Sequence, residues 1–289
     1  MRYHQLTVRG ERRLAVADGS ETYDLTSAAS KLRTFGDLVR AADIADQSPD
    51  EIATRHIDDA ATLDEAEIAQ QQTVPVDADE VWAAGVTYRI SEEAREEESE
   101  EPEIYLNVYD ADRPEIFFKA TPSRTVGPGD EVGIREDSEW DVPEPELGVV
   151  LYEGEIVGYT IGNDMSSRSI EGQNPLYLPQ AKVYDRCCSL GPCIATGETV
   201  GNPHELTMSM SITRDGKELY NDETSTGEMV RSCEELVSYY NRHNAVPELA
   251  VLLTGTSLVP EDDFTLQEGD SITIDIENIG TLTNDVTPV

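Results

Sequence analysis

Residues 144–164 read EPELGVVLYEGEIVGYTIGND, in which two apolar runs meet at Glu153 and Gly154. Runs rich in Val, Ile and Tyr on either side of a tight turn signal predict a β-hairpin. The hairpin is apolar along most of its length, so we expect it to form part of the core. Pairing is about symmetric around the turn and would bring Asp164 close to Glu144 and Glu146.

The three carboxylates that bracket this hairpin raise an electrostatic question. Residues two apart on a strand share a face, so Glu144 and Glu146 repel each other and lose hydration if they are covered. Solvent exposure would remove the difficulty, and so would a divalent cation, because hard cations take carboxylate oxygens as ligands. The pattern leaves both open: an exposed acidic pair, or a magnesium or manganese site formed with Asp164.

The rest of the larger part of the chain predicts more strands than helices. Short apolar runs punctuated by Gly, Pro and Asp fill residues 116–194 and the C-terminal end, and one helix is predicted within residues 225–243. We find no alternation of strands with long helices. The pattern favours a β-dominated α+β fold built from hairpins and closed sheets.

Two domains are expected. Residues 1–75 predict a small α+β unit, with strands turning at Gly10 and Gly19 and a helix that starts at Pro49 behind the N-cap Ser48. The polar stretch QQQTVPVDAD then predicts a linker, and residues 76–289 form the larger domain.

Within the larger domain, residues 88–113 form an acidic, mostly helical insertion with little apolar surface. Such a segment is either a solvated flap or a lid over an active site.

Acidic residues dominate the composition: 59 against 21 basic residues, a formal net charge of -38. A halophilic cytoplasm is the natural setting, because the Debye length falls to about 3 Å at ~1 M salt and repulsion is screened. Nucleic acid and anionic membranes are excluded as partners for such a surface. No apolar run is long enough to span a membrane, and the N-terminus lacks a signal-peptide core. The four cysteines are expected to be reduced.

Lysine is scarce, with only four in the chain. Lys182 occupies one of these positions, and lysine can exchange its proton where arginine effectively cannot. A regular strand would put Lys119 and Glu115 on the same face. That face either lines a site or is exposed to solvent. An ion pair with a carboxylate is the simpler interpretation of each lysine, and for Lys119 it is preferred.

From about residue 81 to the C-terminus, the chain resembles the fumarylacetoacetate hydrolase family. The matching segments, in family order and spacing, are AAGVTY, PEIFFKATPSRTVGPGDEV, EPELGVVLYEGEIVGYTIGNDMSSRS, KVYDRCCSLGPCI and LLTGTS…EGDSITIDIENIGTLTN. The resemblance implies a mixed β-roll, a homo-oligomer, and magnesium (with manganese as the alternative) held by Glu144, Glu146 and Asp164. It also implies that a substrate contacts Val86, Thr87, Lys182 and Thr256.

One departure from the family pattern bears on the reaction. Hydrolases of the family carry a His–Glu dyad that activates water, but this chain has Ser91 at the histidine position and Ala94 near the glutamate position. Thr87 replaces the family's asparagine. The four histidines match no dyad position: His4, His56, His204 and His243. Without an imidazole, this segment is poorly equipped to generate hydroxide.

The family's sugar-acid branch also lacks the dyad, and the resemblance to it implies dehydration of 2-keto-3-deoxy-D-pentonates to 2,5-dioxopentanoate in oxidative pentose degradation. This elimination needs a base and an acid but no water nucleophile. Glu115 and Lys182 are the candidates, in either order. Two alternatives remain: a hydrolase or decarboxylase of acylpyruvate-type oxo-acids on the same fold, and a non-catalytic member that binds oxo-acids or mediates oligomerisation.

Overall fold

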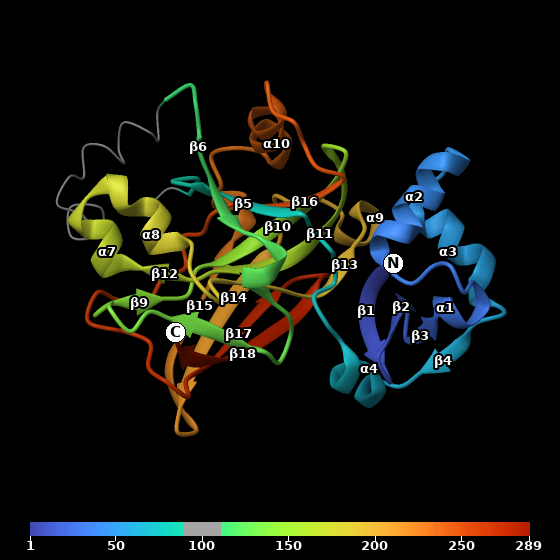
Figure 1. The fold of residues 1–289 in the computed structure, drawn as a ribbon, viewed down its shortest axis with the longest axis horizontal. Helices are drawn as coiled ribbons and strands as arrows, with labels where there is room; N and C mark the ends of the chain where they lie inside the picture. The colour runs from blue at the N-terminus through green and yellow to red at the C-terminus, as the bar shows by residue number, and fades with distance from the viewer. Residues whose placement is uncertain (89–110) are drawn as a thin grey trace.

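The structure is a computed structural model that describes residues 1–88 and 111–289. Strands dominate these residues, and the predicted β-dominated α+β class is confirmed (Figure 1). No helix in the described ranges is both long and apolar enough to cross a membrane.

The larger sheet runs through most of the molecule in the order β4-β3-β2-β1-β13-β11-β10-β16-β5-β6, with β7 beside β13. Most neighbours are antiparallel, but β16 pairs with β5 and β13 with β7 in parallel. The bounds are β1 Arg2–Val8, β2 Glu11–Asp18, β3 Glu21–Asp24, β4 Ala61–Leu63, β5 Glu80–Gly85, β6 Glu115–Ala120, β7 Thr125–Val126, β10 Pro145–Tyr152, β11 Glu155–Asp164, β13 Cys188–Ala195 and β16 Leu249–Leu253.

A five-stranded sheet in the order β15-β14-β17-β18-β8 lies against the first, with β18 next to β13 (Figure 1). Its strands are β8 Glu131–Ile134, β14 Thr207–Arg214, β15 Lys217–Ser225, β17 Ser271–Ile276 and β18 Gly280–Pro288. A two-stranded ribbon joins β9 Asp141–Val142 to β12 Ser166–Ser167.

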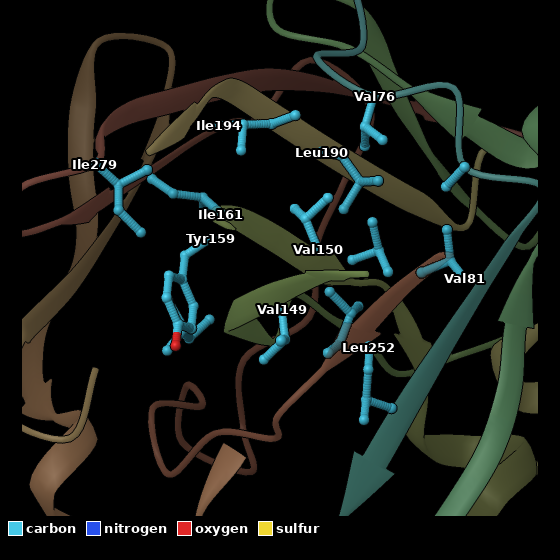
Figure 2. Close-up of a cluster of buried hydrophobic side chains, with 14 of the residues drawn as sticks. Val76, Val81, Val149, Val150, Tyr159, Ile161, Leu190, Ile194, Leu252 and Ile279 are labelled. Atoms are coloured by element: carbon cyan, nitrogen blue, oxygen red, sulfur yellow. The ribbon is translucent and has the colours of Figure 1, made fainter. Parts of the chain in front are cut away.

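The predicted hairpin is β10–β11, and it lies at the centre of the larger sheet. Glu153 and Gly154 turn the chain with φ values of 48° and 86°. Val149, Val150 and Ile161 pack with Leu190 of β13 and Leu252 of β16 in the core (Figure 2). Each such buried side chain contributes roughly 1.5–3 kcal/mol to folding, so the core holds the hairpin in one register.

The N-terminal residues form the predicted meander and capped helices. Ser48 caps α3 (Pro49–Ile57) and accepts a hydrogen bond from the Glu51 N–H at 3.2 Å. Strand β1 pairs with β13, so the larger sheet continues across residue 75. The Gln5 side chain also bonds the Val74 carbonyl at 2.9 Å. The division of the chain at residue 75 stays a prediction.

The helix predicted within residues 225–243 is shorter than expected. Helix α10 spans Cys233–Asn241, and Ser232 caps it by accepting the Glu235 N–H at 3.1 Å. Ahead of it, Thr226 is buried and its N–H donates to the carbonyl of Leu206, the residue before β14, so this segment does not join helix α10. The other described α-helices are α1 Leu25–Ala28, α2 Phe35–Ala45, α4 Glu65–Gln71, α7 Arg168–Gln173, α8 Leu178–Lys182 and α9 Gly197–Val200.

Candidate metal centre and active site

A pocket opens at the strand ends on one side of the larger sheet, where β5 and β11 end and β6 and β10 begin. Helices α7 and α8 form another wall, and the turn after β16 closes it. Strands β5, β6 and β10 are far apart in the sequence but close together in the sheet. The order of the strands therefore brings the lining residues together. The lining includes the predicted residues Val86, Glu115, Glu144, Glu146, Asp164, Lys182 and Thr256.

The three predicted metal ligands form a buried cluster at these strand ends. Each of Glu144, Glu146 and Asp164 offers a carboxylate oxygen within 4.8 Å of the others, and they are only 7%, 2% and 1% exposed. The hairpin register explains the meeting, because the Asp164 N–H donates to the Glu144 carbonyl at 2.9 Å. These residues form the only metal-compatible cluster found in the described ranges.

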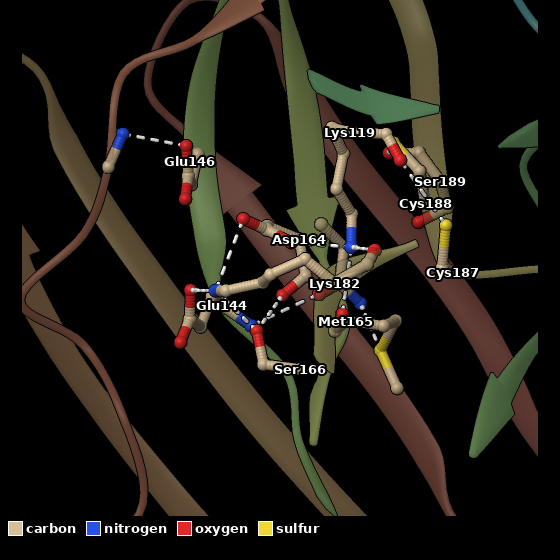
Figure 3. Close-up of polar contacts among 12 residues, drawn as sticks. Lys119, Glu144, Glu146, Asp164, Met165, Ser166, Lys182, Cys187, Cys188 and Ser189 are labelled. Carbon is tan, nitrogen blue, oxygen red and sulfur yellow. Dashed lines mark hydrogen bonds and ion pairs between the residues drawn. The ribbon is translucent and has the colours of Figure 1, made fainter. Parts of the chain in front are cut away.

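The Lys182 ammonium group lies between two of these carboxylates (Figure 3). Its Nζ donates to Glu144 Oε2 at 2.6 Å, to Ser166 Oγ at 2.6 Å and to Asp164 Oδ2 at 3.3 Å. An ammonium has three N–H donors, and all three have acceptors here. Burial disfavours the charge on Lys182, but Asp164 and Glu144 outweigh it and raise its pKa.

Lys119 forms the predicted ion pair, but its partner is a member of the cluster. Its side chain is fully buried and its Nζ lies 2.6 Å from Asp164 Oδ1. The expectation of a regular strand was wrong, because the β5–β6 register pairs Val81 with Ala120 and Trp82 with Phe118 and skips Lys119. This bulge re-aims the side chain, and Lys119 also donates to the Met165 carbonyl at 2.8 Å and to the Lys182 carbonyl.

The cationic side chains around the cluster pair with Glu144 and Asp164 but not with Glu146. Burial opposes ionisation of Glu144, but Lys182 and Arg168 (Nη2 at 3.0 Å from Oε1) outweigh it and lower the pKa of Glu144 to about 2. Glu146 has no ion pair in the described part of the chain and accepts only the Gly255 N–H at 2.6 Å. Burial, followed by the charges of Asp164 and Glu144, raises the pKa of Glu146 well above its ordinary value. Glu146 is therefore the carboxylate that an added cation would stabilise most.

Glu115 lies opposite Gly85 in the β5–β6 ladder. A Cβ atom on Gly85 would come within 2.1 Å of Glu115 Oε2, so the glycine leaves the space that the carboxylate fills. Next to it, Val86 has a φ of 54°, a left-handed conformation that β-branched residues rarely adopt. Such strain is typical of ligand-binding positions, and it costs of order 1–3 kcal/mol.

The two predicted threonines differ in position. Thr256 lines the pocket, and its Oγ1 accepts the Leu258 N–H at 3.0 Å. The Thr87 side chain is not part of the lining. It is buried behind Gly255 and donates to the Thr254 carbonyl at 2.5 Å. The role of Thr87 in substrate binding stays a prediction.

Sequence reasoning missed two charged residues of the lining, Arg168 and Glu171. Both belong to α7, which Ser167 caps by accepting the Ile170 N–H at 3.3 Å. Residues three apart on a helix share a face, so the capped helix could have indicated that both side chains point the same way. The sequence did not indicate which face meets the pocket. Most of the predicted lid, with Ser91 and Ala94, lies outside the described residues.

Comparison with known proteins points to one family. The family model described as fumarylacetoacetate (FAA) hydrolase C-terminal matches residues 80–287. The chain is 69% identical to a probable 2-keto-3-deoxyxylonate dehydratase from Haloferax volcanii over the full length of both proteins. It is 46% identical to a 2-dehydro-3-deoxy-D-arabinonate dehydratase from Saccharolobus solfataricus, over 75% of this chain and 74% of that protein.

The fold is similar to that of solved dehydratases. A 2-keto-3-deoxy-D-arabinonate dehydratase complexed with magnesium and 2,5-dioxopentanoate superposes with a TM-score of 0.83 at 35% identity, covering 100% of this chain and 99% of the other. A fumarylacetoacetate hydrolase from Exiguobacterium antarcticum, at 21% identity and a TM-score of 0.74, shares the fold over the full length of both chains.

Proposed function

The chain belongs to the fumarylacetoacetate hydrolase family, and on that premise we propose that it is a hydro-lyase that converts a 2-keto-3-deoxy-D-pentonate to 2,5-dioxopentanoate in oxidative pentose degradation. The observation that carries the proposal is a pocket that combines a buried three-carboxylate cluster, a lysine ammonium and a further carboxylate. No histidine is among the described residues that line it. This donor set suits elimination and lacks the imidazole that a water-activating hydrolase would use.

Magnesium is the cofactor that we propose, with manganese as the alternative. Glu144, Glu146 and Asp164 would hold it, since hard cations prefer carboxylate oxygens. The fit is supported by Glu146, a buried carboxylate that makes no ion pair in the described residues, whereas Glu144 pairs with both Arg168 and Lys182. When bound, magnesium supplies Lewis-acid stabilisation to the oxygens of a 2-oxo acid and so acidifies the adjacent C3–H.

We assign the proton transfers to two residues on different walls. Lys182, the buried lysine whose side chain lines the pocket, is assigned as the acid that protonates the departing C4 hydroxyl, which leaves as water. Glu115, in the β5–β6 wall, is then the base that removes the C3 proton. The C3–C4 double bond that forms then isomerises: C5 loses a proton and C3 gains one, and the resulting C4–C5 enol gains a proton at C4 as its hydroxyl loses one to give the aldehyde. Thr256 and Val86 would contact the substrate beside the cluster.

The finer parts of the proposal concern assembly and organisation. We expect a homo-oligomer in the cytoplasm, a separate N-terminal domain of residues 1–75, and a lid formed by residues 88–113. Light scattering on the purified protein in molar salt tests the first of these expectations, and a single-subunit mass would contradict it.

Product identification tests the function directly. The protein is incubated with magnesium and 2-keto-3-deoxy-D-pentonate in D2O at molar KCl, and the products are identified by NMR. We expect 2,5-dioxopentanoate with solvent deuterium at C3 and at C4. Efficient cleavage of acylpyruvates would favour the hydrolase alternative. Binding of 2-oxo acids without turnover of any would favour the non-catalytic one.

A further inference from the structure

Glu171 has no role in the reaction proposed above, yet it lies in the pocket. It belongs to α7 and is half-buried, with its Oε2 atom fully covered by protein. Oε2 has no hydrogen-bond partner in the described part of the chain. A covered carboxylate oxygen without a donor is costly, because it has lost water and gained nothing in return.

The nearby cations of the site have other partners. Arg168, one turn earlier on α7, directs Nη2 to Glu144. The charge of Glu171 contributes to the raised pKa of Lys182, but the three N–H donors of Lys182 bond Glu144, Asp164 and Ser166. Because Oε2 is covered, a molecule that enters the pocket would bond the Glu171 carboxylate through Oε1, which is not among the covered atoms and has no donor in the described residues either.

We propose that Glu171 recognises the C5 hydroxyl of the substrate by accepting its hydrogen bond. This inference rests on the dehydratase function proposed above. A carboxylate accepts but does not donate, so it selects the hydroxyl-bearing end of the ligand over the oxo-acid end. The oxo-acid end belongs at the cluster of Glu144, Glu146 and Asp164. Glu171 belongs to the α7–α8 wall and Glu115 to the β5–β6 wall of the same pocket, so the two carboxylates are assigned to different parts of one ligand.

Two unreactive ligands isolate this contact. 2-Oxopentanoate and 5-hydroxy-2-oxopentanoate differ only in the C5 hydroxyl, and neither has a C4 hydroxyl to eliminate. Their dissociation constants for the magnesium-loaded protein are measured by calorimetry, with the open-chain concentration of each fixed by NMR. We expect the unmodified protein to prefer the hydroxylated ligand by about 10- to 100-fold, as for a hydrogen bond to a charged group.

Glu171→Met should abolish this preference while leaving 2-oxopentanoate binding unchanged, and Glu171→Gln should retain part of it. With the full substrate, Glu171→Met should raise KM by a larger factor than it lowers kcat. Glu198→Met, at an exposed glutamate on the short helix α9, is the matched control and should keep the full preference. Melting temperatures in molar KCl check that each variant is folded.

The outcomes separate this inference from the proposed function. If the unmodified protein neither dehydrates the substrate nor binds 2-oxopentanoate, the proposed function fails. If it does both and Glu171→Met keeps the preference for 5-hydroxy-2-oxopentanoate, the proposed function stands and the role of Glu171 is wrong. Equal weakening of both ligands would also overturn the role, because it would show a general effect on the pocket.

Discussion

The surface and the pocket of this protein use the same residue type in opposite ways. On the surface, acidic side chains are solvated, and pairs such as Arg12–Asp77 have both side chains 47% exposed. In the pocket, Glu144, Glu146 and Asp164 are almost fully covered and lie among three cations. Two of the four lysines in the chain are buried at this cluster. In so acidic a chain, the scarce lysines mark the site better than the carboxylates do.

We expect the largest difference between the pocket and the surface in the effect of replacing a glutamate on enzymatic activity. Glu146→Gln removes a buried carboxylate that makes no ion pair in the described residues and that an added cation would stabilise, so we expect metal binding and turnover to be lost while the fold persists. Chelation with EDTA should have the same effect, reversed by added magnesium. Glu198→Gln is the surface control and should keep full activity. Turnover that survives both Glu146→Gln and EDTA would contradict the metal site.

Lys182→Arg keeps a positive charge but replaces an ammonium that reaches three acceptors with a planar guanidinium. General acid catalysis is typically worth ~10²–10⁴-fold, and we expect a loss of kcat in that range. Steady-state kinetics in molar KCl measures it. A variant with a near-normal rate would make Lys182 a structural ion-pair partner, as the exposed Arg12 is.

Breaking a buried ion pair should lower the free energy of unfolding more than breaking an exposed one. Lys119→Met leaves Asp164 buried with one cation fewer, and breaking a buried pair typically costs about 3–5 kcal/mol in the free energy of unfolding. Arg12→Met breaks a solvated pair and should cost about 0–1 kcal/mol. Denaturant titration of both variants in the same salt gives the comparison, and equal losses would show that burial does not govern these pairs.

Added salt should screen the repulsion between surface charges but have little effect on the buried ion pairs of the cluster. With a net charge of -38, the unmodified protein should melt at progressively higher temperature as KCl rises from about 0.1 M to ~2 M. The deficit of Lys119→Met should persist at high salt, because buried pairs are screened much less. A melting temperature indifferent to KCl would mean that the surface charge is neutralised by other means.

The smallest effect concerns pH and Glu146. Its pKa is raised in the folded protein, so above the ordinary value of 4.5 the folded chain holds a proton that the unfolded chain has released. Stability from this residue therefore falls as pH rises through that window. In EDTA, the stabilisation of Glu146→Gln relative to the unmodified protein should be near zero below pH 4.5 and grow toward neutrality. Thermal melts across pH check this, and a difference that does not change with pH would contradict the shift.

The sequence by itself determined the hairpin and the meeting of its three carboxylates. The turn at Glu153–Gly154 starts the pairing locally, and a bulge between Val150 and Leu151 shifts the register before the strands reach Glu146 and Gly162. The predicted cap at Ser48 is equally local, since it involves a backbone N–H three residues away. Helix α10 fills only part of the segment in which it was predicted, because Thr226 is bonded to Leu206, a residue 20 positions away.

Only the tertiary structure decided which other side chains meet the cluster. Lys119 reaches Asp164 through a bulge that no periodicity reveals. Arg168 and Glu171 enter the pocket because α7 packs beside the strand ends, and Thr87 turns away because the Thr254 carbonyl accepts its hydroxyl. These contacts join segments that are distant along the chain. Their geometry depends on the order of the strands in the sheet, which local sequence patterns do not encode.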